Sequence, residues 1–562
     1  MEADILAPLH RFGLPQIRHK TVARAWHSSF HQTPWDGVMG AFVFRHFQGI
    51  CDMSTARALA IMAALCLPAP AFAADAVQLN LLGTYKTGIF DEGAAEIVAY
   101  EPAGKRLYVV NADAKVVDIL DLANPAGPVK AGVLNAKAHG KKANSVAVHG
   151  GLIAVAVAAD PDQEPGKVVF FTSEGKEAGA VEVGAGPDMV TFTPDGAYVL
   201  VANEGEPSDD YKTDPEGSVS IIKVADKSVR TAGFGAFSRD KLPDGMRMGH
   251  PSASFAQDVE PEYIAVSPDS RTAYVTLQEN NAIAIVDIAS AKVTKVFGLG
   301  YQDHSKIAFD PSNKDGGARL GTWPVWGMYM PDSIAAYEAG GKTYLVTANE
   351  GDSREYEAFE DEARIKDVAL DPAAFPNAEE LQAKSNLGRL KISPLSSDAD
   401  GDGKIEKLMA FGSRSFSIWD EAGNQVFDSR SDFEKITAER LGVNFNSTND
   451  ENDSGDNRSD DKGPEPEGVT VGKVGAKTYA FIGLERAGGI MVYDVTVPAA
   501  ARFAGYVNNR DFAGDPKAGT AGDLAPEGLA FISADVSPNG KPLLAVGNEV
   551  SGTTSIYEVT VK

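Results

Sequence analysis

The chain has 562 residues, with 52 Lys and Arg against 78 Asp and Glu, a formal net charge of −26 and only two cysteines. So acidic a surface repels nucleic acid and anionic lipid and favours cations, although solubility alone would account for much of the charge. Both cysteines, Cys51 and Cys66, precede residue 74, so the rest of the chain has neither a disulfide nor a thiol nucleophile.

Residues 53–73 have the pattern of a leader. After Met53 come Arg57, an apolar run at 58–67 and the small-residue cleavage pattern Ala71-Phe72-Ala73, which together predict a secretory signal peptide. The apolar run is too short for a membrane span, which needs about 20 residues. We therefore predict a mis-assigned or non-native extension at 1–52, a signal peptide at 53–73 and one domain at 74–562. This organisation predicts a periplasmic or secreted protein without a membrane span.

One short strand template recurs through the predicted domain. Each copy is an acidic or amide residue followed by an apolar strand, such as EYIAV or EGVTV. An element that recurs through a long chain is typical of a repeat architecture. The seven copies begin at Glu96, Asn144, Asp188, Glu262, Asp332, Glu467 and Glu527.

Each copy continues through a turn into further short strands. Short β-rich strands separated by Gly, Pro, Asn and Asp turns predict an all-β meander. Four strands in each of seven copies predict a seven-bladed β-propeller. The last copy ends at Lys562 after its third strand, so we expect Gln78–Tyr85 to supply the fourth strand and close the ring.

Long insertions at 225–259, 301–330, 351–386 and 413–463 are predicted to lie on one face, where a rigid scaffold usually carries its binding loops. Helices are predicted at Asp432–Leu441 and within 376–386. The third strand of the fifth copy is predicted at Arg389–Ser393.

The template places like charges around one opening, because the first strand of a propeller blade lines the central channel. The ends of the second strands add seven carboxylates at the same mouth: Asp113, Asp160, Glu204, Glu279, Glu350, Glu485 and Glu549. Carboxylates this close require a cation among them, and calcium is the first choice because it takes 6–8 oxygen ligands. The alternative is that each acid caps a turn or accepts backbone hydrogen bonds.

Repeated Asn-Glu phrases mark the best candidate ligands. The phrase ANEG occurs at 202–205 and at 348–351, each time followed by an acid, and GNE occurs at 547–549. Glycine between two acids lets the backbone turn so that both face one centre. The predicted metal ligands of the channel mouth are Glu204, Glu206, Glu350, Asp352, Glu465, Glu467, Glu527 and Glu549.

A separate calcium signal lies at 398–406. Asp398, Asp400 and Asp402 alternate, Gly403 takes the sixth place and Ile405 the eighth, as in an EF-hand-type loop. Met409 stands where such a loop has its bidentate Glu. We predict a structural calcium site between a third and a fourth strand, hence on the face opposite the insertions, with a solvated acidic turn as the alternative.

Basic residues among these acids point to an oxyanion such as phosphate. The acidic segment 444–468 carries two of them, Arg458 and Lys462, and leads directly into the sixth template strand. The chosen phosphate-binding residues are Arg354, Arg414 and Arg486, with His250 as a candidate acid or base. Ordinary surface solubility is the competing explanation for each.

Several longer phrases, among them ANEGEPSDDY, TANEGDSREY, DADGDGKIEKLMAFGSRSFSIWD and DDKGPEPEGV, resemble the choice-of-anchor I family across residues 79–562. That family is similar to mesenchyme-specific cell-surface glycoproteins, and its bacterial members are often labelled alkaline phosphatases. The resemblance implies an exported or surface-held propeller with calcium and phosphate-ester chemistry.

Three functions remain open at this stage. The first is a metal-dependent phosphatase, in which the metals activate water against a small phosphorylated substrate. The second is a non-catalytic calcium-binding protein of the surface or medium, and the third is a propeller lactonase. We expect a monomer that binds no nucleic acid. The fold alone does not choose among these functions.

Overall fold

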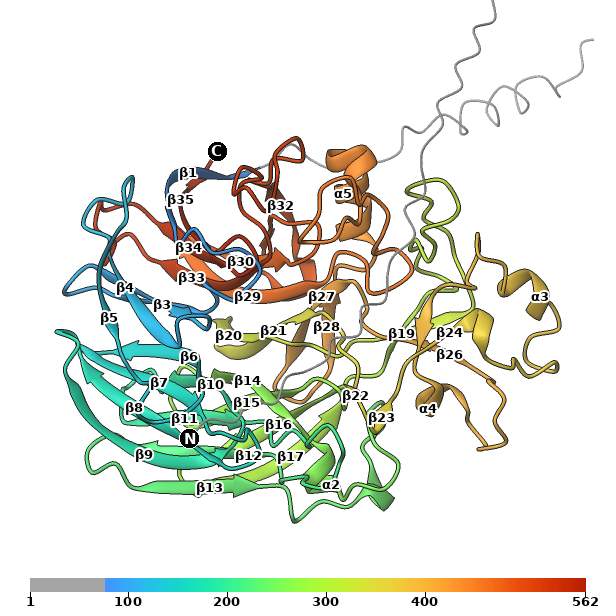
Figure 1. The fold of residues 1–562 in the computed structure, drawn as a ribbon, viewed down its shortest axis with the longest axis horizontal. Helices are drawn as coiled ribbons and strands as arrows, with labels where there is room; N and C mark the ends of the chain where they lie inside the picture. The colour runs from blue at the N-terminus through green and yellow to red at the C-terminus, as the bar shows by residue number, and fades with distance from the viewer. Residues whose placement is uncertain (1–75) are drawn as a thin grey trace, which may run out of the picture. The chain divides into compact units, whose positions relative to one another are not determined.

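The computed structural model describes residues 76–562, and the predicted extension and signal peptide at 1–73 lie outside them. Strands dominate the described part of the chain and form four-stranded antiparallel sheets (Figure 1). This confirms the prediction of an all-β fold with propeller-like blades. Within 76–562 no helix is both long and apolar enough to cross a membrane.

Consecutive strands form each of the first four sheets, because every strand is followed by a turn that returns the chain beside it. These sheets are β2 (Val98–Glu101), β3 (Arg106–Asn111), β4 (Val116–Asp121) and β5 (Val129–Leu134); β6 (Lys142–His149), β7 (Leu152–Ala158), β8 (Pro165–Thr172) and β9 (Glu177–Ala185); β10 (Pro187–Phe192), β11 (Tyr198–Asn203), β12 (Ser218–Lys223) and β13 (Val229–Gly233); and β14 (Pro261–Val266), β15 (Thr272–Leu277), β16 (Ala282–Asp287) and β17 (Lys292–Gly298).

The remaining four-stranded sheets follow the same order, except that a long insertion interrupts one and the N-terminal strand completes the last. They are β20 (Ile334–Ala339), β21 (Lys342–Asn349), β27 (Ser415–Asp420) and β28 (Gln425–Asp428); β29 (Pro466–Val474), β30 (Lys477–Leu484), β31 (Ile490–Asp494) and β32 (Arg502–Val507); and β33 (Pro526–Ile532), β34 (Leu543–Asn548), β35 (Thr553–Val561) and β1 (Val77–Lys86).

Strand β1 joins the last sheet as predicted, pairing antiparallel with β35. Val77 and Leu79 are buried against Tyr557, so the pairing is reinforced by an apolar contact. The first strands of the sheets contact one another in the order β2, β6, β10, β14, β20, β29, β33 and back to β2. The fold is therefore propeller-like, with the template strands innermost.

The insertions leave after second or fourth strands, as predicted, but two of them have other bounds than expected. The predicted insertion 413–463 is wrong in its first part, because 415–428 contain β27 and β28; the insertion there spans 429–465. The other is longer than expected. It spans 350–414, between β21 and β27. The predicted strand at Arg389–Ser393 is wrong as a blade strand: β25 (Lys391–Ile392) pairs with β24 (Ala363–Arg364), and β27 is the third strand of that sheet. The cause is that Leu390 and Ile392 are buried in a separate small core inside the insertion. Their apolar pattern therefore indicated burial correctly, but the burial is in the insertion and not in a blade.

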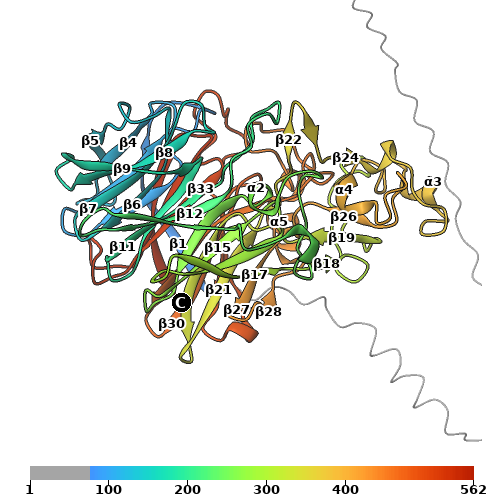
Figure 2. The same cartoon turned by 90° about the horizontal axis from the view of Figure 1, so that it is seen from below.

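This correction moves the predicted calcium loop. Residues 398–406 lie within the insertion between β21 and β27, so they belong to the insertion-bearing side and the predicted opposite face is wrong. Figure 2 shows α3, α4, β24 and β26 of that insertion grouped beside the sheets.

The predicted helix at Asp432–Leu441 is confirmed as α5, and α3 (Ala378–Leu381) confirms the one expected within 376–386. The other short elements lie almost entirely in the insertions: η1 (Arg239–Lys241), α2 (Phe255–Asp258), β18 (Tyr301–Asp303), β19 (Val325–Met328), β22 (Glu355–Tyr356), β23 (Phe359–Glu360), η2 (Ile365–Asp367), α4 (Pro394–Ser397), β26 (Leu408–Ala410), η3 (Gly442–Asn444) and η4 (Pro498–Ala500).

Closure of the last sheet by β1 yields a stability prediction. Leu79→Ala should lower the free energy of unfolding by about 2–4 kcal/mol, because Leu79 is 5 % exposed in the core beneath β35. Leu81→Ala in the same strand is the matched control, since Leu81 is 42 % exposed. Urea unfolding measures both, and equal losses would contradict the proposed role of β1.

Candidate functional site

The polar residue of the template sits where the innermost strand loses its regular pairing. The register shifts between Pro187 and Val190 in β10, and between Pro261 and Ile264 in β14. Strands β6, β29 and β33 carry the same irregularity at the same point of the template. A bulge leaves the extra residue unpaired and re-aims its side chain. In these strands the shifted segments contain Asn144, Asp188, Glu262, Glu467 and Glu527.

Template residues from different blades meet around one internal cavity. Its volume is about 60 Å³. The polar template residues that line it are Asn144, Asp188, Asp332, Glu467 and Glu527, with Ile97 and Tyr263 beside them. Segments more than 300 residues apart in the sequence thus contribute to a single channel, which is what the repeat predicts.

Burial and mutual repulsion both disfavour charge on the channel acids. Burial raises the pKa of four of them well above the ordinary value, and the neighbouring carboxylates raise it further: Glu262, Asp332, Glu467 and Glu527. Burial also raises the pKa of Glu96 to about 7 and that of Asp188 to about 6, although Lys142 opposes both shifts. Without a further cation, burial and mutual repulsion therefore favour the protonated form of these acids.

A second group of acids lies at the insertion-bearing mouth. Carboxylate oxygens of Glu350, Glu465 and Glu485 lie within 4.8 Å of one another, and all three residues are buried. The Lys462 Nζ is 3.0 Å from Glu350 Oε1 and 3.5 Å from Glu465 Oε2. It also contacts Asp352 Oδ1 at 3.0 Å. A lysine from the 429–465 insertion therefore already supplies positive charge to this group.

Two arginines complete the mouth. Arg458 Nη2 lies 2.6 Å from Glu465 Oε1, and Arg486 Nε donates to Glu465 Oε2 at 2.8 Å. Burial favours the protonated form of Glu465, but Lys462, Arg486 and Arg458 hold its pKa well below the ordinary value. Arg486 also pairs with Glu485 at 2.8 Å. Glu465 is thus the most strongly paired acid of the mouth.

The other predicted phosphate-binding arginines are engaged in buried pairs. Arg354 is 2 % exposed and pairs with Glu260 at 3.0 Å. Arg414 is 3 % exposed, donates to Glu434 Oε1 at 2.7 Å and also binds backbone carbonyls of the 429–465 insertion. Arg354 therefore joins the 350–414 insertion to the segment before β14, and Arg414 joins it to the insertion that contains α5. Arg486, with a side chain that is 25 % exposed, remains accessible in an open pocket.

His250 lies in an aromatic cluster away from the channel cavity. Its ring stacks on Tyr211 with centroids 4.4 Å apart and meets the Phe359 ring edge-on at 4.6 Å. Burial lowers the pKa of His250, and Arg354 lowers it further. The neutral imidazole is therefore the favoured form, as expected for a residue packed among rings.

The remaining predicted ligands are distributed around the mouth. Glu206 accepts a hydrogen bond from the Tyr356 hydroxyl at 3.2 Å, and Glu549 lines an open pocket with Glu485 and Arg486. Burial raises the pKa of Glu204 well above its ordinary value, helped by Asp188. Among the described residues, these acids do not join a group of three with oxygens within 4.8 Å.

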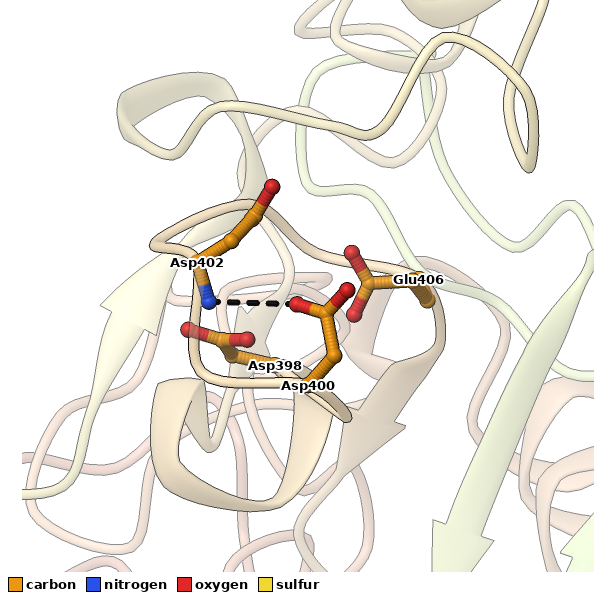
Figure 3. A group of neighbouring side chains, drawn as sticks. All are labelled: Asp398, Asp400, Asp402 and Glu406. Atoms are coloured by element: carbon orange, nitrogen blue, oxygen red, sulfur yellow. Dashed lines mark hydrogen bonds between the residues drawn. The ribbon is translucent and has the colours of Figure 1, made fainter.

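The predicted calcium loop brings its acids together (Figure 3). Oxygens of Asp398, Asp400 and Asp402 lie within 4.8 Å of one another and of Glu406. The amides of Gly401 and Gly403 donate to Asp398 at 2.7 and 2.9 Å. Both glycines have positive φ, 80° and 85°, which lets the chain wrap around the carboxylates.

Three residues of these groups were not among the sequence-predicted ligands. Glu406 occupies the ninth place of the loop, and Glu485 ends a second strand, so the positions of both residues in the sequence could have identified them as ligands. Lys142 carried no such signal, because a lysine at the start of an apolar strand is usually a surface residue, and Lys142 is exposed in the structure. Its role depends on blade packing, which brings β6 beside the acids of other strands.

The raised pKa values predict how the free energy of unfolding depends on pH when a chelator removes divalent cations. The channel acids keep their protons in the folded chain at pH values where the unfolded chain has lost them, so the folded state binds more protons. Stability should therefore be greatest below the unfolded pKa of about 4.5 and fall as pH rises through about 7 for Glu96.

Glu467→Gln should remove part of that loss, since glutamine carries no proton to release. The variant should melt a few degrees above the wild type at pH 8 and close to it at pH 4. Glu357→Gln, on an exposed turn, is the control. Calorimetric melting in EDTA measures all three chains, and a constant difference at both pH values would refute the electrostatic explanation.

Comparison with known proteins adds a family and two distant relatives. The choice-of-anchor I domain model matches residues 96–498. Gigasin-3a of Magallana gigas is 29 % identical over 194 residues, covering 32 % of this chain and 66 % of that protein. The mesenchyme-specific cell surface glycoprotein of Strongylocentrotus purpuratus is 27 % identical over 288 residues, covering 44 % of this chain and 36 % of that protein. The matches span less than two thirds of either relative.

Solved structures give weaker likenesses. Kuenenia stuttgartiensis hydrazine synthase aligns with a TM-score of 0.44 and 14 % identity, over 85 % of this chain and 100 % of that one. The β-propeller domain of Myceliophteria thermophila Cps50 (Swd1) aligns with a TM-score of 0.41 and 10 % identity, over 86 % of this chain and 100 % of that one. Because the family model spans most of the blades and the channel acids, the chain belongs to the choice-of-anchor I domain family.

Proposed function

We propose that the four-stranded sheets form a seven-bladed propeller and that the protein is an exported, non-catalytic calcium-binding protein of the cell surface or medium. The observation that carries this function is the gathering of Asp398, Asp400, Asp402 and Glu406 within 4.8 Å. The ring order of the innermost strands and the pairing of β1 with β35 support the blade number.

Calcium suits the chemistry of this loop. All four side chains offer carboxylate oxygens, the donors that calcium prefers, and the loop leaves room for further oxygens from backbone and water. The Lys404 Nζ contacts Asp402 Oδ2 at 2.5 Å and partly balances the charge of the loop. An incoming divalent cation would replace that exposed contact at small cost.

Two observations support an extracellular or surface location. Residues 53–73 carry the pattern of a secretory signal peptide. The sea urchin relative is named as a cell surface glycoprotein, and the family is described as a choice-of-anchor domain.

Neutralising the loop tests the proposed calcium site. Asp400→Asn with Asp402→Asn should abolish one calcium equivalent, because two of the four loop carboxylates lose their charge. Equilibrium dialysis of the full chain against calcium measures the stoichiometry. Asp269→Asn, in an exposed turn where the side chain is 60 % accessible, is the matched control. An unchanged stoichiometry in the loop variant would exclude this site.

Phosphomonoester hydrolysis is the second candidate function, and one observation favours it. An open pocket of about 390 Å³ is lined by Arg458, Lys462 and Arg486 together with Asp352, next to the Glu350, Glu465 and Glu485 group. Basic groups beside acids that can hold a metal are the parts that metal-assisted phosphate transfer requires. The acids already pair with these cations, which is why calcium binding without catalysis is placed first.

Turnover of a chromogenic phosphate monoester at alkaline pH, with and without calcium, decides between the two functions. The non-catalytic proposal predicts no turnover above that of Arg486→Gln, because the guanidinium is held by Glu465 and Glu485. Calcium-dependent turnover in the wild type that falls at least tenfold in Arg486→Gln would establish the hydrolase instead.

A further inference from the structure

The channel is electrostatically uneven. Lys142, an exposed residue at the start of β6, acts on three template acids, Glu96, Asp188 and Glu527, and also on Glu206 and Glu549. The acids of β14, β29 and the segment before β20 have other carboxylates as their largest electrostatic neighbours: Glu262, Asp332 and Glu467. In the ring order of the innermost strands these two sets form opposite arcs. One arc has a fixed cation, and for the other no basic residue ranks among the largest influences within the described residues.

Buried oxygens without partners lie on these acids. Glu262 is 9 % exposed, and its Oε2 has no hydrogen-bond partner within the part of the chain that the structure describes. The same holds for Glu467 Oε2, Glu527 Oε2 and Asn144 Oδ1. Buried polar atoms are nearly always paired, so several unpaired oxygens around one cavity indicate a bound species. Three of these four residues line the channel cavity, and Tyr263, the residue next to Glu262, lines it too.

The size of the cavity and the spacing of its carboxylates determine whether a bound cation would keep its water. Its volume of about 60 Å³ exceeds the roughly 10–15 Å³ that one water needs, so an ion with some of its water fits. Within 76–562, the channel carboxylates form no group of three with oxygens within 4.8 Å. A fully dehydrated ion would therefore lack direct ligands, whereas water can bridge the longer spans.

We propose that the channel binds one hydrated divalent cation on the arc formed by Glu262, Asp332 and Glu467, with Lys142 as the fixed positive charge of the opposite arc. The donors are all oxygens, which selects a hard cation such as calcium or magnesium. This site is separate from the 398–406 loop, and the proposal for the channel does not depend on calcium binding to the loop.

The test uses the full chain with the loop neutralised by Asp398→Asn, Asp400→Asn and Asp402→Asn, titrated with calcium in a calorimeter. One calcium equivalent should remain. Adding Glu262→Gln and Glu467→Gln should weaken it about tenfold or more, because two of the nearest negative charges are lost. Lys142→Gln should strengthen it several-fold, because the competing fixed cation is gone. Glu357→Gln should change neither value.

Terbium luminescence supplies a second readout that locates the ion. Tyr263 lines the cavity, so terbium bound there should show tyrosine-sensitised emission that Tyr263→Phe reduces while circular dichroism stays unchanged. The proposal is overturned if the loop-neutralised chain takes up no calcium, or if its affinity is insensitive to both the glutamate and the Lys142 substitutions. Loss of calcium in the loop variants alone would support only the loop site.

Discussion

Repulsion among carboxylates that are largely withdrawn from bulk water is the constraint on which this structure depends. The repeated template brings acids and an amide from several sheets to one cavity, and burial reduces the solvation that would stabilise their charge. The chain has three ways to relieve the repulsion: protonation, tethered cations such as Lys142 and Lys462, and free cations. The insertions supply the tethered cations of the mouth, so fold and charge balance are coupled.

The two acidic regions of the insertion side are built for different purposes. At the mouth, Glu465 pairs with Lys462 and Arg458 of its own insertion and with Arg486, which ties that insertion to the end of β30. In the 398–406 loop two of the four carboxylates are exposed and two are half-buried, and the amides of Gly401 and Gly403 donate to Asp398. Charge that is already paired must lose its partner before it binds a ligand, whereas charge left open to solvent is available to one.

The repeating template was enough to predict the sheets and the closing strand, and the helix at Asp432–Leu441 was predicted from its own segment of the sequence. It failed at Arg389–Ser393, because Leu390 and Ile392 are buried in a core of the insertion that looks, in sequence, like a blade strand. Arg354 and Arg414 looked like phosphate ligands because sequence does not show partners, and each is buried against a glutamate far along the chain or across an insertion. Lys142 was overlooked for the same reason, since its neighbours come from other blades.

Anomalous diffraction from crystals grown with manganese, a hard divalent cation, tests the central claim most directly. The account predicts a peak inside the channel, on the side of Glu262, Asp332 and Glu467 and away from Lys142. Peaks confined to surface carboxylates, with the channel acids hydrogen-bonded to one another, would contradict it, because protonation alone would then relieve the repulsion.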